Sequence, residues 1–363
     1  MKILFYIGNL RKGGAERVVA TLSNKLVEKN EVIIITTTDE KIEYSLNKSI
    51  KLFNLKNFDG NKNPLVKNII YLKRLKDYIK DIDPDIILGF LPEPSYRLLL
   101  LKPFIKTPVI ISDRNDPKVE YASLKSRTIM KTLYKKADGF VFQTEEARSY
   151  FSKKIQDKSV VIANPVDDRF LKTKYIGEKS TEFINVGRLN EQKNQMLLME
   201  SFKDVIKKYP NYKLLIYGDG NLKNELNIYI KTNKLNNKVK LCGNVDNIEN
   251  ILKEKKCFIL SSKYEGMPNA LMEAMAVGVP CISTDCPCGG PRELIKNNIN
   301  GLLVKSNDKN ELVSAMYKII ENDKMCKKIA MSAKKNMNNY SCDKIVSKWF
   351  EFMKEVYKSE KNN

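Results

Sequence analysis

Short apolar runs separated by amphipathic stretches recur along most of this sequence, and this alternation constrains the fold more than any other feature. In the first half, the candidate strands are residues 2–8, 31–37, 50–55, 85–90, 108–112, 139–143 and 159–163. Stretches with helical periodicity lie between them, including 15–29, 65–80 and 121–137. In 65–80, apolar residues recur every three or four positions from Leu65 through Ile69 to Ile79, which predicts one buried helix face. Apolar runs alternating with helices are typical of a parallel sheet covered on both faces.

The alternation breaks once and then restarts. A polar, aperiodic segment follows Asn164-Pro165, and we expect residues 166–180 to be a linker. Further strands are predicted at 181–186, 213–217, 238–242, 257–261, 279–284 and 301–304. After Asp308 the pattern is helical to the end. The sequence therefore predicts an α/β protein with two tandem doubly wound, Rossmann-like domains, residues 1–165 and 181–340, and a final helix at 341–363.

Composition narrows the chemistry that such a chain can perform. With 363 residues and 42% apolar content, the chain is long enough for two or three domains with real cores. It contains no histidine, which excludes Ser-His-Asp and Cys-His machinery and any His-ligated zinc. Chemistry must therefore rest on carboxylates, Arg, Lys, backbone amides or the substrate itself.

The chain is strongly basic, with 64 Lys and Arg against 43 Asp and Glu, a net charge of +21. A nucleic-acid partner, an anionic membrane surface and a lysine-rich host proteome are three competing explanations. No basic stripe interleaved with stacking aromatics supports the first. The longest leucine run, Leu98–Leu101, is too short to span a membrane, so we expect a soluble or peripheral protein.

All seven cysteines follow position 240, and Cys281, Cys286 and Cys288 cluster. An odd number without a regular framework or a secretory signal indicates reduced thiols in the cytoplasm. A thiolate metal site is disfavoured, because neither His nor a second Cys pair accompanies the cluster.

In each of the two predicted domains, a glycine-containing turn follows the first strand. Gly13-Gly14 leads into a helix whose N-terminus offers amides to an anion, although a plain tight turn explains the pair equally well. In the second domain, Gly187-Arg188 ends a strand and Lys193 follows five residues later. Both cations are predicted at the carboxyl edge of a parallel sheet, where two positive charges suit a diphosphate. Two solvated charges at a helix start are the alternative.

The segment from Ser262 to Met275 runs from a strand end into a helix and carries two carboxylates. Glu265 lies in the loop, and Glu273 lies on the helix within an apolar stretch where an unpartnered carboxylate is costly. Both are predicted to face one pocket.

These motifs resemble, in order, the retaining glycosyltransferases of family four, which have the GT-B fold of two domains facing across a cleft. Further matches are Gly218-Asp219-Gly220, Gly289-Gly290-Pro291-Arg292-Glu293 and Asn300-Gly301-Leu302-Leu303-Val304. The resemblance implies that Arg188 and Lys193 grip the donor diphosphate, that Glu273 binds the ribose, and that Glu265 lies beside the transferred sugar. It assigns further donor contacts to Gly13, Gly14, Gly187, Gly218, Val245, Asn269, Ala270 and Leu271. It also implies an interdomain hinge at Asn164-Pro165 and a last helix that returns to the first domain.

One segment departs from the common family pattern. Where many members carry a His after the fifth strand, this chain has Arg114-Asn115-Asp116-Pro117, which resembles a variant of bacterial capsule and O-antigen enzymes. Arg114, Asn115 and Asp116 are then the expected sugar or acceptor contacts.

The activity implied is retaining transfer of a hexosamine from a UDP-sugar to a lipid-diphosphate-linked saccharide, at the inner face of the plasma membrane, in surface polysaccharide assembly. No metal and no cofactor are expected, since Arg188 and Lys193 replace the metal of other transferases. A nucleotide-sugar epimerase or a glycan phosphorylase of the same architecture is the alternative.

A basic stripe lies in the predicted helix 121–137. Arg127, Lys131 and Lys135 recur every four residues, so they share one helix face, while Ile129, Leu133 and Ala137 form the face expected to pack on the sheet. The stripe is interpreted either as ordinary solvated surface or as a site for the lipid-linked diphosphate or anionic headgroups.

Overall fold

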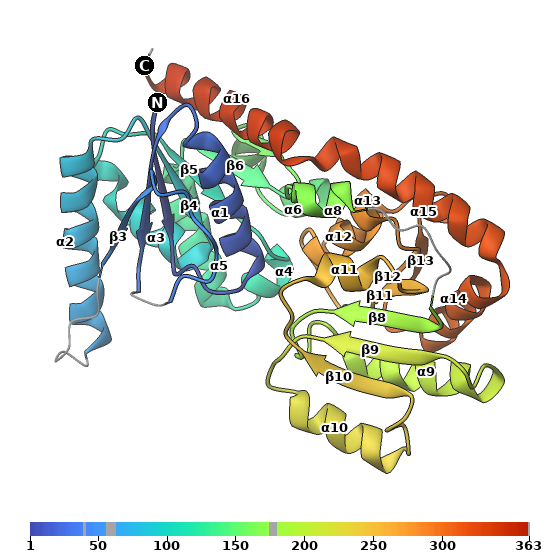
Figure 1. Cartoon of the computed structure of the whole chain (residues 1–363). Helices are drawn as coiled ribbons and strands as arrows, with labels where there is room; N and C mark the ends of the chain where they lie inside the picture. Colours follow the sequence, from blue (N-terminus) through green and yellow to red (C-terminus); the bar gives the residue numbers. More distant parts are fainter. Residues whose placement is uncertain (39–40, 56–62, 174–179, 362–363) are drawn as a thin grey trace. The chain divides into compact units, whose positions relative to one another are not determined.

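The structure, a computed structural model, describes residues 1–38, 41–55, 63–173 and 180–361. These fall into two units (Figure 1). The first comprises Met1–Pro165 with Cys342–Asn363, and the second comprises Val166–Ser341. No described helix is both long enough and apolar enough to cross a membrane.

The first unit is built on a seven-stranded parallel sheet in the order β3-β2-β1-β4-β5-β6-β7. Its strands are β1 (Lys2–Ile7), β2 (Glu31–Thr36), β3 (Lys51–Asn54), β4 (Ile86–Phe90), β5 (Val109–Ser112), β6 (Gly139–Phe142) and β7 (Ser159–Val161). In the interior strand β1, consecutive residues from Ile3 to Ile7 are fully buried. Successive side chains of a strand point to opposite faces, so both faces of this sheet are covered.

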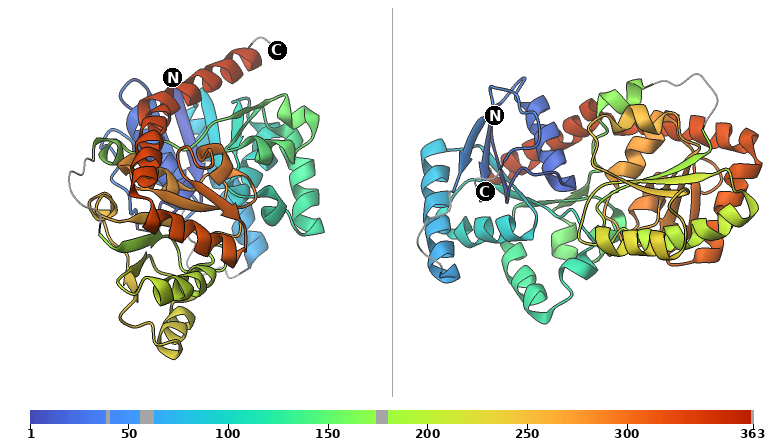
Figure 2. Two further views of the ribbon diagram at one scale, coloured as in Figure 1. Left: turned by 90° about the vertical axis from the view of Figure 1, so that its right-hand side faces the viewer. Right: turned by 60° about the horizontal axis from the view of Figure 1, so that its bottom comes forward.

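Helices of the first unit connect the strands and cover the sheet. They are α1 (Gly14–Leu26), α2 (Pro64–Ile82), α3 (Pro92–Leu101), η1 (Lys102–Phe104), α4 (Pro117–Glu120), α5 (Leu124–Leu133), η2 (Tyr134–Lys136), α6 (Glu145–Ser149), α7 (Lys153–Gln156) and α16 (Cys342–Lys361). The C-terminal helix α16 packs beside α1 (Figures 1 and 2). Its Trp349 is fully buried and stacks on Phe90 of β4 at 5.7 Å between ring centroids, which anchors the chain end in this unit.

The second unit has a six-stranded parallel sheet in the order β10-β9-β8-β11-β12-β13. Its strands are β8 (Glu182–Val186), β9 (Lys213–Tyr217), β10 (Val239–Gly243), β11 (Cys257–Leu260), β12 (Cys281–Asp285) and β13 (Leu302–Lys305). Its helices are α8 (Asp168–Lys172), α9 (Gln195–Lys208), α10 (Lys223–Thr232), α11 (Ile248–Leu252), α12 (Asn269–Val277), α13 (Gly290–Leu294), α14 (Lys309–Glu321), α15 (Asp323–Met337) and η3 (Asn338–Tyr340). The core lies between the sheet and α9, α10, α14 and α15.

The predicted architecture of two doubly wound parallel-sheet domains is confirmed, and every predicted strand is present with ends within two residues. In each sheet the chain reverses its direction of winding beside the central strand, between β1 and β4 and between β8 and β11. Open α/β sheets bind ligands at such switch points, outside the carboxyl ends of the strands.

Three sequence expectations need correction. In α2, Leu65 and Ile69 are 74% and 66% exposed, because among the described residues the packing contacts of the helix are made by its later turns, with Tyr71, Leu75 and Ile79 buried. The expected linker contains α8, whose fully buried Phe170 belongs to the second unit and which contacts α12; residues 174–179 lie outside the described residues.

The expected helix 121–137 is also interrupted. Its residues form α5 and the 3-10 turn η2, while a separate short helix, α4, precedes them. Ser123 caps α5 by accepting a hydrogen bond from the amide of Ser126, so the helix begins at Leu124 rather than at 121.

Candidate functional site

The loops that follow β8 and β11 meet at the switch point of the second unit. Lys193 comes from the first loop and Glu265 from the second, and β8 and β11 are neighbours in the sheet. The two loops are held together by backbone bonding, since the amide of Lys263 donates to the carbonyl of Gln192 at 2.8 Å. Parallel strands thus place two residues 72 positions apart at one edge of the sheet.

Lys193 and Glu265 form a buried ion pair. The Nζ of Lys193 lies 2.5 Å from the Oε1 of Glu265, and the side chains are only 16% and 7% exposed. The hydroxyl of Ser262 donates to the same carboxylate oxygen at 2.6 Å. The methylene groups of Lys193 lie against Gly187. The pair holds a positive and a negative charge together at the carboxyl edge, within reach of a charged ligand.

Glycines allow the loops around this pair to pack at backbone distance. Gly218 has φ +135°, and a Cβ on it would lie 2.0 Å from the carbonyl oxygen of Gly187. A Cβ on Gly290 would lie 1.7 Å from the carbonyl oxygen of Gly266, in the loop that carries Glu265. These approaches require glycine, and they bring the turns after β9 and β12 against the turns after β8 and β11.

Arg188 differs from Lys193 in its surroundings. Its side chain is exposed and pairs with no carboxylate among the described residues, while its backbone carbonyl accepts a hydrogen bond from the Nε2 of Gln195 at 2.9 Å. Val245, another of the expected donor contacts, follows β10 and is 37% exposed. Arg188 therefore leaves a whole guanidinium available to an anion at this edge.

The helix α12 carries the remaining predicted residues of the second unit. Glu273 is 7% exposed and lies in a helix buried from Leu271 to Val277, as the apolar flanks suggested. Asn269 and Ala270 begin the helix. The amide of Leu271 donates to the carbonyl of Pro268 at 3.1 Å, so its hydrogen-bonding capacity is used within the helix end.

In the first unit, the Gly13-Gly14 turn is held by a residue that the sequence did not single out. The Tyr44 hydroxyl accepts from the amide of Gly13 at 2.9 Å and donates to its carbonyl at 2.8 Å. Gly14 is exposed and begins α1. The Gly13 amide thus donates to Tyr44, and Gly14 is the residue of the glycine pair whose backbone is exposed to solvent.

Arg114 lies in the loop after β5 and is partly buried. Its guanidinium donates to the Oγ of Ser112 at 3.2 Å and to the Oδ1 of Asn164, and it lies over the ring of Phe90. Burial lowers the pKa of Arg114 to about 9. No carboxylate among the described residues neutralises this cation, which is the electrostatic setting of an anion-binding group.

Asn115 and Asp116 are engaged locally. Asp116 is 3% exposed, and its carboxylate caps α4 by accepting from the amide of Lys118 at 2.9 Å. The Nδ2 of Asn115 donates to Glu120 at 3.2 Å. Both side chains shape the loop that carries Arg114, and the geometry gives Asp116 a capping role where a sugar contact was expected.

Beneath this loop lies a buried cluster of one carboxyl and two phenols. The hydroxyls of Tyr121 and Tyr134 lie 2.8 Å from the two carboxyl oxygens of Asp113, and 2.7 Å from each other. With Asp113 ionised, both phenol protons go to the carboxylate, and the contact between the phenols holds no proton. A protonated carboxyl supplies the third proton. Burial raises the pKa of Asp113 to about 6, in accord with this count.

This cluster predicts a pH-dependent stability. Because the pKa of Asp113 is raised from 3.8 to about 6 in the folded state, its stabilisation is complete below pH 3.8 and is lost as the pH rises through 6. The loss amounts to about 3 kcal/mol. The variant Asp113→Asn lacks this titration. In thermal-unfolding scans, the melting temperature of the variant minus that of the parent should therefore increase from pH 5 to pH 7.5. A constant difference between the two proteins over that range would contradict it.

The cysteine cluster is buried. Cys281, Cys286 and Cys288 are at most 1% exposed, and burial raises the pKa of Cys286 to about 12. Over the described ranges, no three His, Cys, Asp or Glu side chains are placed to hold a metal ion.

Sequence reasoning missed the partners of the predicted residues more than the residues themselves. Tyr44 and Tyr134 carry no motif, because they act through contacts with residues distant in sequence. Ser262 lies in the segment that carries Glu265, but nothing in the sequence marks it as the partner of that carboxylate. Asn164 was noticed only as a hinge, yet its Oδ1 also accepts from the Nε2 of Gln143 at 2.7 Å. A polar residue directly after a buried strand is the one available signal for such partners.

Comparisons with known proteins agree with this two-unit division. Residues 12–170 match the family described as Glycosyltransferase Family 4, and residues 167–336 match the family described as Glycosyl transferases group 1. An uncharacterized glycosyltransferase of Methanocaldococcus jannaschii is 33% identical, over 83% of this chain and 86% of its own. The N-acetylgalactosamine-N,N'-diacetylbacillosaminyl-diphospho-undecaprenol 4-alpha-N-acetylgalactosaminyltransferase of Campylobacter jejuni is 30% identical, over 92% and 94%. Anabaena HepE, solved in complex with UDP, shares the fold with a TM-score of 0.81 at 17% identity, over 98% of this chain and 100% of that chain.

Proposed function

This chain belongs to the glycosyltransferases that combine a family 4 domain with a group 1 domain, and from that premise we propose that it transfers a sugar from a nucleoside-diphosphate sugar to a lipid-diphosphate-linked saccharide. The observation that carries the proposal is the pair of cations, Arg188 and Lys193, at the switch point of the second unit. The Arg188 guanidinium pairs with no carboxylate in the part of the chain that the structure describes, and Lys193 is held in place by Glu265.

The donor is proposed to be a UDP-linked hexosamine. The Campylobacter relative is named for transfer of N-acetylgalactosamine to a diphospho-undecaprenol-linked sugar, and the Anabaena structure contains UDP. Arg188 and Lys193 would neutralise the diphosphate, and the buried carboxylate of Glu273 would accept hydrogen bonds from the ribose hydroxyls. Charge-assisted bonds of this kind are roughly twice as strong as neutral ones.

Transfer is proposed to proceed with retention. The acceptor hydroxyl would attack the anomeric carbon from the face that the diphosphate leaves, and the departing phosphate oxygen would take the hydroxyl proton. Arg188 and Lys193 would then stabilise the negative charge that grows on the leaving group. Glu265 would lie beside the sugar and fix the position of Lys193. No protein nucleophile is needed for this step.

The test is a donor screen with a defined acceptor. UDP- and GDP-sugars are offered with a lipid-diphosphate-linked disaccharide, and nucleotide release is measured with and without the acceptor. We expect UDP release from a UDP-hexosamine only when the acceptor is present, and an α-linked product from an α-linked donor by NMR. Release of nucleotide without any acceptor, or conversion of the donor to an epimer, would contradict the transferase proposal.

We also expect activity without a metal ion. Two aspartates separated by one residue, Asp81 and Asp83, lie at the end of α2. Asp85 follows them, and its carboxylate accepts a hydrogen bond from the amide of Lys2 at the amino end of β1. These carboxylates therefore lie at the edge opposite to the ligand edge of their sheet, whereas Arg188 and Lys193 provide positive charge at the donor edge. EDTA should leave the initial rate of UDP release unchanged. A strict requirement for Mn²⁺ or Mg²⁺ in EDTA-treated enzyme would contradict this assignment.

A further inference from the structure

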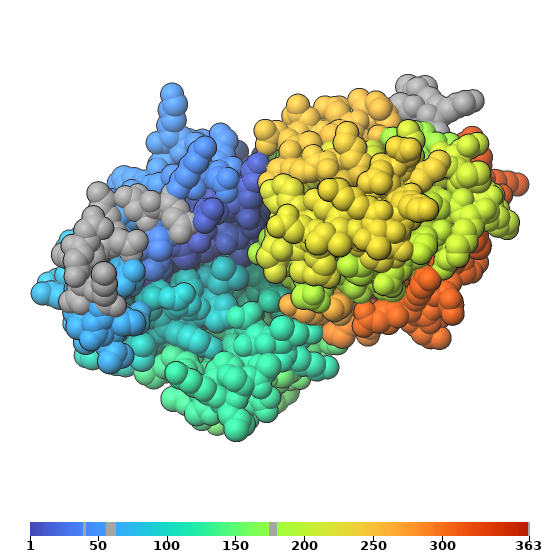
Figure 3. All heavy atoms as spheres, turned by 90° about the horizontal axis from the view of Figure 1, so that it is seen from below, coloured from blue at the N-terminus to red at the C-terminus, as the bar shows by residue number. Residues whose placement is uncertain are grey.

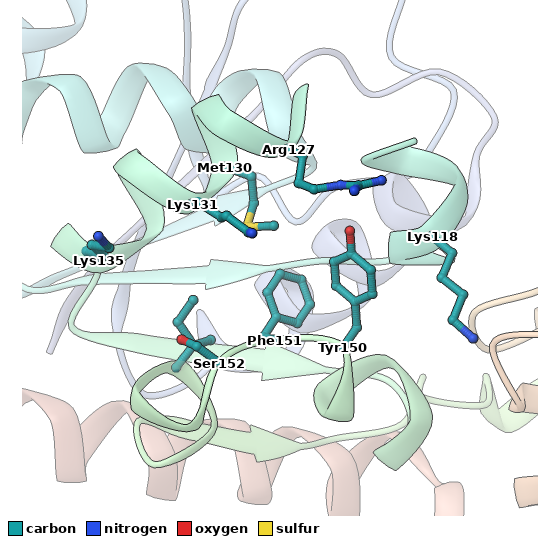
Figure 4. Close-up of a pocket in the computed structure, with 9 residues that line it drawn as sticks. Lys118, Arg127, Met130, Lys131, Lys135, Tyr150, Phe151 and Ser152 are labelled. Carbon is teal, nitrogen blue, oxygen red and sulfur yellow. The ribbon is translucent and has the colours of Figure 1, made fainter. Parts of the chain in front are cut away.

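A cavity of about 510 Å³ lies within the first unit, beside α5 (Figure 4). Four cationic side chains line it: Lys118 from α4, Arg127 and Lys131 from α5, and Lys135 from η2. The cavity is within the size range of small-molecule sites. The segment around α5, teal-green in Figure 3, lies at the surface of the molecule, so the cavity's cationic rim faces solvent.

The charge in this cavity is not compensated by the protein. No acidic side chain lines it, and none of the four cations forms an ion pair within the described part of the chain. Among the described residues, the Arg127 guanidinium donates to the carbonyls of Tyr121 and Ala122, at 3.4 Å each. Uncompensated cations around one hollow repel one another, and an anion in the hollow relieves this repulsion.

The inner wall of the cavity is apolar. Met130, Phe151 and Ile155 line it and are at most 6% exposed. Tyr150 also lines the cavity, and Figure 4 shows its hydroxyl pointing toward Arg127, with Lys118 and Lys135 at opposite ends of the lining. The cavity thus offers several donors to an anion and a hydrocarbon surface beside them. A phosphate or diphosphate on an apolar chain matches both parts, whereas a free anion leaves the apolar wall unused.

The cavity is connected to the loop that carries Arg114. α4 starts directly after that loop, and the Asp113 carboxyl ties the loop to Tyr134 of η2. The ring of Tyr121 lies 6.3 Å from that of Tyr150 and 6.1 Å from that of Phe151, so one aromatic cluster joins the loop to the cavity wall. The polar end of a ligand bound in the cavity would therefore be held at a fixed position relative to the carboxyl edge of the sheet.

We propose that this cavity binds the diphosphate and the adjoining hydrocarbon of the lipid-linked acceptor, with Arg127, Lys131, Lys135 and Lys118 around the diphosphate and Met130, Phe151 and Ile155 against the hydrocarbon. The assignment rests on the proposed function for the identity of the ligand. It gives the basic stripe of α5 a specific role and places acceptor recognition in the first unit.

The test measures binding directly, without turnover. Farnesyl diphosphate is titrated calorimetrically into the parent and into the triple variant Arg127→Gln/Lys131→Gln/Lys135→Gln. Each charge-assisted contact is worth about tenfold in affinity or more, so the triple variant, which loses three of them, should bind about 1,000-fold more weakly. The matched control is Lys125→Gln/Lys136→Gln/Lys154→Gln, which removes the same charge from exposed positions on α5, η2 and α7 outside the cavity lining and should bind like the parent.

Further titrations distinguish a lipid diphosphate from other ligands that carry only some of its features. Farnesol and inorganic pyrophosphate each match half of the cavity and should bind more weakly than farnesyl diphosphate. Phosphatidylglycerol vesicles test a membrane headgroup: if only vesicle binding falls in the triple variant, the diphosphate assignment is overturned. Equal binding of farnesyl diphosphate by the parent and both triple variants also overturns it. The single change Lys131→Glu gives a second test should the triple variant fail to fold. Binding that depends on these cations supports the cavity assignment even if no nucleotide sugar is turned over.

Discussion

Replacing Lys193 by alanine should destabilise the protein as well as inactivate it. Lys193 and Glu265 lie 2.5 Å apart and are largely shielded from water, so removing the ammonium leaves a buried, uncompensated carboxylate. Breaking a buried ion pair in this way typically costs about 3–5 kcal/mol in free energy of unfolding. Activity should fall with it, because the proposed diphosphate site loses one of its two cations. Urea unfolding of parent and variant measures the first effect, and kcat/KM for the donor measures the second.

A double variant separates the two effects. Lys193→Met combined with Glu265→Gln removes both charges and fills a similar volume, so it should recover much of the stability lost in Lys193→Ala. The same double variant should not recover activity, because no cation has been restored beside the diphosphate. An Lys193→Ala protein as stable as the parent would mean that the pair contributes nothing to folding. Recovery of turnover in the double variant would show that Lys193 serves only the structure.

The fold could be predicted because its physical causes are local in the sequence. A strand buried on both faces must be apolar throughout, so strands such as Val32–Ile35 are visible without any knowledge of their neighbours. The carboxyl ends of parallel strands lie at one edge of a sheet, so a residue directly after such a strand is placed by topology alone. Arg188, Lys193 and Glu265 were placed at the carboxyl edge of the second sheet for this reason.

The competition for individual polar groups could not be predicted in the same way. The Asp116 carboxylate caps α4, the Gly13 amide is taken by Tyr44, and the Leu271 amide bonds to Pro268. Each of these groups looked available in the sequence because its partner has no distinctive pattern. The exposed first half of α2 has a similar cause, since helical periodicity shows which face is apolar but not how far along the helix its partner extends.

Replacing Arg188 by alanine should lower kcat/KM for the donor by roughly ten- to a hundredfold, which is the value of one charge-assisted contact at about 1.5–3 kcal/mol. In contrast to Lys193→Ala, this change should leave the melting temperature unaltered, because the Arg188 side chain is exposed and pairs with no carboxylate in the described residues. Arg188→Lys keeps the charge but loses the forked guanidinium, so it should recover only part of the rate.

The matched control for Arg188→Ala is Lys231→Ala, which removes an exposed cation from the last turn of α10 in the same unit and should behave like the parent; Lys231 forms no ion pair within the described ranges. It tests whether activity depends on the position of Arg188 or merely on the net charge of this basic protein. If Lys231→Ala loses as much activity as Arg188→Ala, the effect is a general one of surface charge. Turnover by a folded Arg188→Ala protein at the rate of the parent would contradict its role at the diphosphate, and the donor would then depend on Lys193 alone. The expected rate for Arg188→Lys lies between those of the parent and the alanine variant. It would show that the charge accounts for part of the effect of Arg188 and the guanidinium fork for the rest.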